Sequence, residues 1–197
     1  MPNWCNNNLR LEHTDPAMIQ RFVSAFKKGA AMQEFLPCPQ ELLDSPAPFR
    51  GDSADALVEK YGASDWYDFC VSNWGTKWDA APTQIEWDED SVSFQLETAW
   101  SPPIAFYDKL AELGYSVEAY YQEEGMCFVG KYEDGFDDYY EYGHMSADDM
   151  ETDLPEWVNE QYGLIDQTRD NEEWEEEEDE EDDEEEEFDD SDWERTE

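Results

Sequence analysis

The residues best suited to a small-molecule site lie in one short, tryptophan-rich segment. It combines two indoles, a hydroxyl, an ammonium group and a carboxylate, supplied by Trp74, Thr76, Lys77, Trp78 and Asp79. The segment is not a phosphate-binding loop, which needs a longer glycine spacing and a second glycine before the lysine. Tryptophan pairs more often pack one element against another, so a structural role is the alternative to a ligand role.

A second group of chemically capable residues is acidic. Four carboxylates stand at positions i, i+3, i+4 and i+7: Asp134, Asp137, Asp138 and Glu141. On a helix this spacing places neighbouring side chains about 5–6 Å apart, close enough to imitate a row of phosphates. We predict a partner-binding surface that includes these four and the acidic residues that follow, Asp148, Asp149, Glu151, Asp153, Glu156 and Glu160.

From Asp170 the sequence becomes a low-complexity polyacidic tail. Residues 170–197 contain 21 acidic residues and one basic residue, and like charges at i, i+4 disfavour a helix, so we expect disorder. Aromatic side chains inside such a run are typical of interaction tails. The tail residues predicted to contact a partner are Trp174, Phe188, Asp189, Asp190 and Trp193. The alternatives are a solvated tail, or one that shields the chain's own partner site.

Groups suited to catalysis or metal binding are few. Glu141 and His144 have E-x-x-H spacing, but in a single copy with a glycine inside it, whereas di-metal sites use the motif in pairs. His13 is the other histidine. The cysteines have no zinc-like spacing; they are Cys5, Cys38, Cys70 and Cys127. We therefore expect no metal, no cofactor and no enzymatic activity.

The charge of the chain restricts its partners. There are 54 acidic residues against 11 Lys and Arg, a formal net charge of -43, and residues 1–169 alone carry -23. This excess opposes direct binding to nucleic acids or anionic membranes and favours basic partners. The chain lacks a run of membrane-spanning length and a signal-peptide core, so we expect a soluble cytoplasmic protein with reduced thiols.

Hydrophobic periodicity predicts the fold. Period-two alternation indicates strands at 8–13, 84–88, 91–98, 116–123 and 126–133, and helical spacing follows Asp15-Pro16 and Pro102-Pro103. The order predicts an α+β fold, a ferredoxin-like split βαβ sheet with an extra edge strand. We predict three regions: the ferredoxin-like domain over 1–133, with a helical insertion at 30–82 packed on the sheet; an acidic helical extension over 134–169; and the disordered tail over 170–197.

Four motifs, in order along the chain, resemble the YubB ferredoxin-like domain family. They are Pro2-Asn3-Trp4-Cys5-Asn6-Asn7, Phe35-Leu36-Pro37-Cys38-Pro39, Trp74-Gly75-Thr76-Lys77-Trp78-Asp79 and Thr98-Ala99-Trp100-Ser101-Pro102-Pro103. The resemblance covers residues 1–133 and implies the same fold, found in small proteins of plasmids, phages and bacterial genomes. It implies a bacterial host and a mobile-element context, no established activity, and nothing about the acidic extension.

Helices on one side of such a sheet leave the other face open unless the insertion covers it. RNA binders of this fold stack bases on aromatic residues of that face, with basic residues nearby. Here carboxylates dominate, which opposes RNA binding. The outward positions that we infer are Arg10, Glu12, Glu86, Asp88, Gln95, Glu97, Glu118, Tyr120 and Lys131.

The sequence favours a phage- or plasmid-borne acidic protein that mimics nucleic acid and inhibits a DNA-binding host factor, such as a defence nuclease or restriction complex. The net charge becomes more negative along the chain, from -9 over residues 1–109 to -14 over 110–169 and -20 over 170–197. A charge that served only general solubility would be spread evenly. One alternative is an adaptor or chaperone-like protein whose acidic tail holds a basic partner. Another is a ligand-binding or enzymatic role of the tryptophan-rich insertion.

Overall fold

The computed structural model describes residues 3–81 and 83–175 of the 197-residue chain. The chain divides into two compact units, Met1–Glu141 and Tyr142–Glu197. The boundary of the first unit therefore lies eight residues beyond the predicted end of the ferredoxin-like domain.

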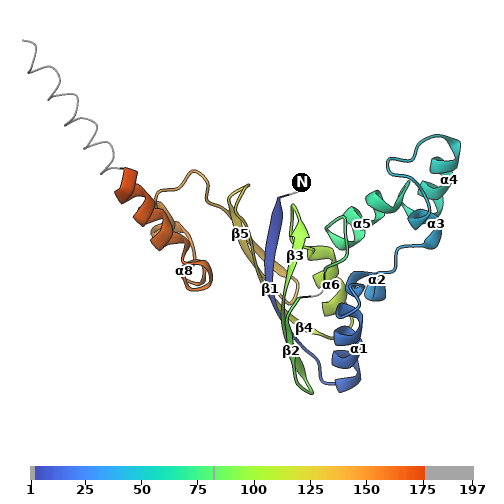
Figure 1. The fold of residues 1–197 in the computed structure, drawn as a ribbon, viewed down its shortest axis with the longest axis horizontal. Helices are drawn as coiled ribbons and strands as arrows, with labels where there is room; N and C mark the ends of the chain where they lie inside the picture. Colours follow the sequence, from blue (N-terminus) through green and yellow to red (C-terminus); the bar gives the residue numbers. More distant parts are fainter. Residues whose placement is uncertain (1–2, 82, 176–197) are drawn as a thin grey trace, which may run out of the picture. The chain divides into compact units, whose positions relative to one another are not determined.

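The first unit is built on a six-stranded sheet with the order β2-β3-β1-β4-β5-β6 (Figure 1). All neighbouring strands are antiparallel. Strands β1 and β2 are connected through helix α1 and are separated in the sheet by β3, which is the split βαβ arrangement. The predicted ferredoxin-like α+β fold is confirmed. The strands are β1 (Trp4–Glu12), β2 (Ile85–Trp87), β3 (Ser91–Ala99), β4 (Ser116–Glu123), β5 (Phe128–Glu133) and β6 (Phe136–Glu141).

The sheet has two additional strands beyond β4, whereas the sequence predicted one. The predicted helix over residues 134–141 is wrong, because β6 pairs with β5 along its whole length. Asp134 and Gly135 form the two-residue turn between them, with φ of 45° and 98°, as a type I′ hairpin turn requires. An Asp-Gly pair followed by aromatic residues is a strong hairpin signal, and here it outweighs the helical spacing of the carboxylates.

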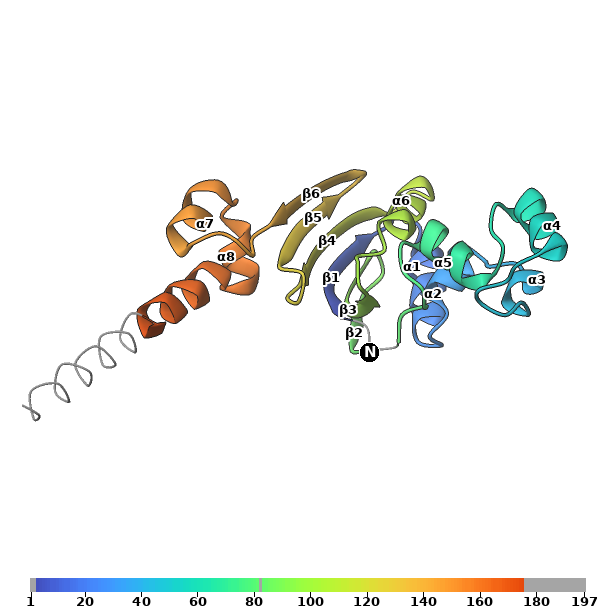
Figure 2. The same cartoon turned by 90° about the horizontal axis from the view of Figure 1, so that it is seen from above.

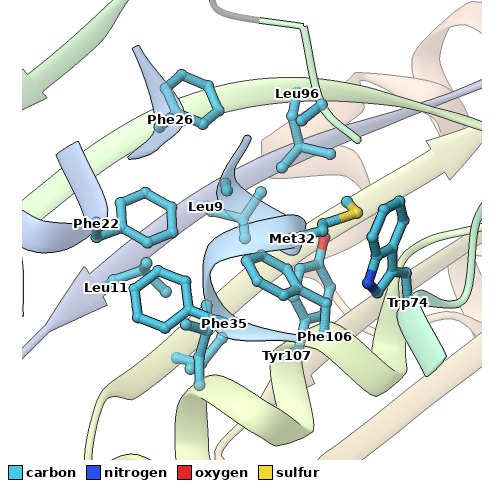
Figure 3. Close-up of a cluster of buried hydrophobic side chains, with 14 of the residues drawn as sticks. Leu9, Leu11, Phe22, Phe26, Met32, Phe35, Trp74, Leu96, Phe106 and Tyr107 are labelled. Atoms are coloured by element: carbon cyan, nitrogen blue, oxygen red, sulfur yellow. The ribbon is translucent and has the colours of Figure 1, made fainter. Parts of the chain in front are cut away.

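Two helices cover one face of this sheet and enclose the core (Figures 1 and 2). Helix α1 (Pro16–Phe26) begins after Asp15, whose side chain accepts a hydrogen bond from the first turn. Helix α6 (Ile104–Glu112) follows a pair of prolines. Figure 3 shows the centre of the core, where side chains from the strands cluster with side chains from the helices; they include Leu9, Leu11 and Leu96 from the sheet, and Phe22, Phe26 and Phe106 from the helices.

The insertion between α1 and β2 forms a further helical layer. Its described helices are α2 (Ala31–Phe35), α3 (Gln40–Leu43), α4 (Asp52–Tyr61) and α5 (Trp66–Trp74), so the predicted helical insertion is confirmed. Helix α2 packs against α1 and α6, and α5 packs against α6. The insertion therefore reaches the sheet mainly through α1 and α6, while α3 and α4 lie beyond α5, away from the sheet (Figure 2).

The opposite face of the sheet carries no helix from residues 3–81 and 83–141 (Figure 2). The predicted alternation of β1 is confirmed: Arg10 and Glu12 are exposed on this face, and Leu9 and Leu11 are buried on the other. Lys131 of β5 also lies on this face and forms ion pairs with Glu118 (3.3 Å) and Glu133 (2.8 Å). Because Arg10 pairs with Glu12 at 2.8 Å, both cations are already matched by carboxylates.

The described part of the second unit, residues 142–175, contains three short helices. They are α7 (Ala147–Asp153), α8 (Trp157–Tyr162) and a helix over residues 164–175. The helical extension predicted over 134–169 is therefore confirmed from Ala147 onward, and Gly163, which has a φ of 60°, ends α8. Hydrophobic side chains of this unit are buried: Tyr142, Ala147, Met150, Leu154, Val158, Leu164 and Ile165.

The helix over residues 164–175 is tied to α7 by charged side chains. Arg169 forms ion pairs with Asp148 (3.2 Å) and Glu151 (2.8 Å), and the carboxylate of Glu172 accepts a hydrogen bond from Ala147 N at 3.0 Å. The disorder predicted from Asp170 is therefore wrong for residues 170–175. Four of the predicted tail contacts lie outside the described residues: Phe188, Asp189, Asp190 and Trp193.

Strand β5 has a glycine at its centre because a tyrosine of β4 covers that position. A Cβ added at Gly130 would overlap the ring of Tyr121. Tyr121 is fully buried and its hydroxyl donates a hydrogen bond to Asp137 of β6 at 2.6 Å. The missing side chain at Gly130 thus lets one tyrosine tie three strands together.

We predict that Gly130→Ala lowers the free energy of unfolding by about 1–3 kcal/mol, because the overpacked tyrosine must shift. In a Tyr121→Leu background the same substitution should cost less than about 0.5 kcal/mol, because the colliding ring is gone. Urea denaturation of the four proteins measures this coupling. An equal cost of Gly130→Ala in both backgrounds would contradict the explanation.

Candidate functional site

Two of the four motif segments, residues 2–7 and 98–103, meet at a buried asparagine. The side-chain nitrogen of Asn7 donates to the carbonyl oxygen of Cys5 (2.8 Å) and to Thr98 Oγ1 (3.0 Å). Its side-chain oxygen accepts a hydrogen bond from the hydroxyl of Tyr107 in α6 at 2.9 Å. Because these buried polar groups satisfy one another, the network fixes β1 against both β3 and α6.

The loop after α5 is joined to the end of β3 by hydrogen bonds between side chains and backbone. Thr76 Oγ1 accepts from Ala99 N at 3.1 Å, and the hydroxyl of Ser101 donates to the carbonyl oxygen of Gly75 at 2.8 Å. Gly75 has a φ of +84°, and a Cβ there would lie 3.0 Å from Pro103 Cα. A glycine at this position therefore allows the two loops to meet closely.

Three of the five predicted ligand-site residues hold the insertion in place. Trp74 is buried, and its Nε1 donates to the carbonyl oxygen of Leu36 at 2.7 Å. Thr76 is buried in the loop contact with β3. The carboxylate of Asp79 accepts hydrogen bonds from two backbone N–H groups of α2, at 2.8 and 3.0 Å. Burial raises the pKa of Asp79, and these hydrogen bonds oppose that shift.

The other two predicted residues face solvent beside two further tryptophans. Lys77 Nζ lies 3.8 Å from the ring centroid of Trp78 and 4.0 Å from that of Trp100, and the rings of Trp4 and Trp78 are 6.2 Å apart. The three indoles are 42–45% exposed. We call Trp4, Lys77, Trp78 and Trp100 the tryptophan surface. Adjacent exposed aromatic side chains are typical of interaction sites.

Trp100 occupies its place through an unusual backbone conformation. Its φ is +70°, in the left-handed region that costs a bulky residue about 1–2 kcal/mol. Hydrogen bonds on either side hold the bend: Trp100 N donates to Asn3 O at 3.0 Å, and the hydroxyl of Thr98 donates to Ser101 O at 2.7 Å. The bend places the indole beside Lys77.

A pocket of about 320 Å³ adjoins Trp4; it is lined by Asn3, Trp4, Asn6, Glu97, Glu123, Glu124 and Gly125. These residues supply one indole, two amides and three carboxylates, and none of them is cationic. Glu123 is buried, and its carboxylate accepts from the backbone N–H groups of Gly125 (2.9 Å) and Met126 (2.6 Å), which shapes the β4–β5 turn. Glu97 and Glu124 are exposed.

The four carboxylates predicted between residues 134 and 141 do not form one row. Successive side chains of a strand point to opposite faces, so Asp137 and Glu141 lie on the helix-covered side of β6 and Asp138 on the other. Asp134 lies in the turn and accepts a backbone hydrogen bond from β4 at 2.7 Å. Burial raises the pKa of Asp137, and the hydrogen bond from Tyr121 opposes it.

In the second unit the predicted carboxylates are all exposed on helices or their ends; they are Asp148, Asp149, Glu151, Asp153, Glu156 and Glu160. Asp149 forms a capping box with Ser146, and hydrogen bonds from Ser146 lower its pKa. Residues 142–175 contain eleven acidic residues and one basic residue, Arg169. Arg169 pairs with Asp148 and Glu151, and no ion pair between Glu160 and a described residue is present.

The helix over residues 164–175 adds carboxylates that the sequence did not predict as part of a folded surface. It carries Asp166, Asp170, Glu172, Glu173 and Glu175, and Trp174 near its end is 70% exposed. The polyacidic composition predicted disorder here, because like charges weaken an isolated helix. The contacts that stabilise this helix are tertiary contacts with α7, which the local sequence does not indicate.

Among the described residues, no group of three or more His, Cys, Asp or Glu could hold a metal ion. His13 Nε2 lies 3.3 Å from Leu113 O. Cys5, Cys38 and Cys70 are buried. Burial raises the pKa of the Cys5 and Cys70 thiols to about 12, so both are protonated at neutral pH and are poor nucleophiles.

These observations define an acidic α+β protein with a ferredoxin-like sheet, an exposed tryptophan surface and an acidic helical unit. No family model matches the sequence, and no curated protein matches it either. Among solved structures, the chain is similar to protein api92 from Yersinia pseudotuberculosis, family model DUF1281, at 11% identity and a TM-score of 0.39, over 73% of this chain and 99% of that one. A likeness at this level carries no argument about function. Within the described residues, no helix combines the length and apolarity needed to cross a membrane.

We predict that a thiol reagent at pH 8 modifies Cys127 in the native protein and leaves the other three cysteines unmodified. Cys127 is only half-buried, in the β4–β5 turn, whereas burial raises the pKa of the other thiols. Mass spectrometry of peptides after timed labelling measures the result, and labelling in urea is the control in which all four should react. Rapid native modification of Cys5 or Cys70 would contradict the buried placement.

We predict that Asn7→Ala lowers the free energy of unfolding by about 2–4 kcal/mol, because it removes the buried hydrogen bonds that the amide makes with the Tyr107 hydroxyl, the Thr98 hydroxyl and the Cys5 carbonyl oxygen. The control is Asn8→Ala, the adjacent β1 residue, which is only half-buried on the open face and should cost less than about 0.5 kcal/mol. Denaturant titration compares them. Similar costs would show that the amide network does not organise this end of the sheet.

Proposed function

We propose that this chain is a nucleic-acid mimic that binds and inhibits a basic, DNA-binding host protein, such as a defence nuclease or a restriction complex. The observation that carries the proposal is the density of carboxylates on the helical unit at residues 142–175. The motif resemblance of residues 1–133 to a family of plasmid and phage proteins supports a mobile-element origin in a bacterial cytoplasm. Both the partner and the inhibition are open to direct test.

The spacing of charge along the last described helix is close to that of DNA. Twelve helical residues span about 18 Å. Five of them are acidic, which corresponds to one carboxylate per about 3.6 Å of axis, against one phosphate per about 3.4 Å along one DNA strand. A cationic groove shaped for one polynucleotide strand would therefore meet carboxylates at a spacing similar to that of phosphates. The one cation of this helix, Arg169, is matched by Asp148 and Glu151 of α7.

The negative charge of this unit exceeds what its described ion pairs balance. In the first unit, many carboxylates serve the fold: Glu34 and Glu41 pair with Arg or Lys, and Asp65 and Asp79 bind backbone N–H groups. At residues 142–175 one arginine faces eleven acidic residues. Such self-repulsion destabilises a compact state, so its presence favours a role in recognition.

The alternative is an adaptor or chaperone-like protein whose acidic C-terminal segment holds a basic partner without occupying its nucleic-acid site. The exposed indole of Trp174, set among carboxylates, favours this reading, because such an aromatic can anchor a partner pocket rimmed by Lys and Arg. Both functions require a basic partner. They differ in whether duplex DNA competes for it.

We predict that neutralising three helical carboxylates, with Glu160→Gln, Asp170→Asn and Glu173→Gln together, weakens partner binding at least about tenfold in 0.1 M salt and reduces its salt dependence. The three residues are exposed. The tagged full chain first captures proteins from host lysate; the retained DNA-binding protein is then purified, and its affinity for each variant and inhibition of its activity are measured.

The matched control removes the same charges from the first unit, with Asp55→Asn, Glu59→Gln and Glu89→Gln, and should change the affinity less than about twofold. Excess duplex DNA should displace the chain from its partner. Retention of the partner under that competition supports the adaptor instead, and equal weakening by both triple variants would show a general charge effect. A truncation after Glu175 preserves the described helix and separates its contribution from that of residues 176–197.

A further inference from the structure

The tryptophan surface and the adjoining pocket are not explained by the carboxylates of the second unit. Trp4 belongs to both features, because its ring lies 6.2 Å from that of Trp78 and it also lines the pocket. From this arrangement we infer that the pocket beside Trp4 binds the guanidinium group of an arginine side chain from a protein partner. The inference rests on the proposed function in one respect, that the partner is basic.

The chemistry of the pocket wall favours an organic cation. Its described lining combines the Trp4 indole and two asparagines with three glutamates, and none of these residues is cationic. Glu97 and Glu124 are exposed and neither has an ion pair with a described residue. An arginine of the partner would supply the missing positive charge, with its flat face on the indole and its N–H groups on the carboxylates.

The neighbouring lysine shows that this part of the surface already stabilises a cation on indole faces. Lys77 Nζ lies 3.8 and 4.0 Å from the ring centroids of Trp78 and Trp100. The chain's own ammonium group thus occupies those two rings, while Trp4 borders the pocket that contains the carboxylates. A second cation, brought by a partner, would continue the same kind of contact across the surface.

A guanidinium group fits these groups better than a metal ion or an ammonium group. The glutamates do not form a metal-binding cluster, since no such group exists among the described residues. Guanidinium carries five N–H donors in a planar fork, which can reach carboxylate and amide oxygens on several sides while the plane stacks on an aromatic ring. An ammonium group is compact and more strongly hydrated, and would satisfy fewer of these oxygens at once.

The test uses the full chain with ¹⁵N-labelled tryptophan and follows the Trp4 indole N–H signal by NMR, assigned with a Trp4→Phe variant. The probes are blocked arginine, blocked lysine and blocked citrulline, the last of which has a similar shape to arginine and no charge. Arginine should shift the Trp4 signal to saturation, lysine should bind at least about threefold more weakly, and citrulline should leave the signal unchanged. Glu97→Gln should weaken arginine binding at least about fivefold.

The matched control is Glu86→Gln, an exposed glutamate of β2 on the same face of the sheet and outside the pocket lining; it should change arginine binding less than about twofold. The inference is overturned if arginine leaves the Trp4 signal unmoved, if citrulline shifts it equally, or if the two glutamate variants weaken binding to the same extent. A shift produced by oligothymidylate in place of arginine would also overturn it and would indicate base stacking.

The two tests distinguish a failure of this inference from a failure of the proposed function. If arginine does not bind beside Trp4 but the helical triple variant still loses the host protein, the pocket inference fails alone. If arginine binds as expected and DNA does not compete with any captured protein, the nucleic-acid mimic fails while the pocket remains a cation site.

Discussion

The first unit depends on one buried amide, because Asn7 joins the central strand β1 both to β3 in the sheet and to α6 in the helical layer. Its hydrogen bonds to β3 and α6 fix the end of β3, where Thr98 in turn holds Ser101 and the backbone bends at Trp100. A polar network of this kind specifies one arrangement, since every alternative leaves a buried donor or acceptor unpaired. The exposed tryptophans are therefore positioned by groups that are themselves hidden from solvent.

The two units use their carboxylates in different ways. The first unit uses many of them in caps, turns and ion pairs, as with Asp79, which binds the start of α2, and Asp134, which ties the β5–β6 turn to β4. The second unit carries a larger excess than its fold requires, since its ion pairs use one arginine. Many carboxylates of the first unit therefore stabilise its fold, whereas the excess in the second unit opposes a compact state. Under the proposed function, selection for binding a basic partner keeps this repulsive surface.

Most of the sheet was predictable because one of its faces is buried, which imposes a clear alternation on strands such as β1 and β4. Strand β6 lacks that signal, since five of its six residues are exposed, and the spacing of its acidic residues matched a helix by chance. The Asp134-Gly135 pair is the feature of the sequence that indicates the hairpin. The site was harder to predict, because contacts such as that of Thr76 with Ala99 join residues far apart in the sequence. Sequence spacing alone also cannot distinguish the buried, structural Trp74 from the exposed Trp78.

The two proposals assign long-range attraction to the helical unit at residues 142–175 and local recognition to the pocket beside Trp4. An excess of unscreened carboxylates acts over roughly a Debye length, about 8 Å at physiological salt, and raises the rate of encounter with any basic protein. Such attraction alone would not distinguish one basic partner from another. A pocket that pairs an indole with carboxylates acts only at contact and demands a particular side-chain shape. Under the two proposals, the pocket beside Trp4 supplies the selectivity that the charge of the helical unit lacks, and salt should weaken the contribution of the helical unit far more than that of the pocket.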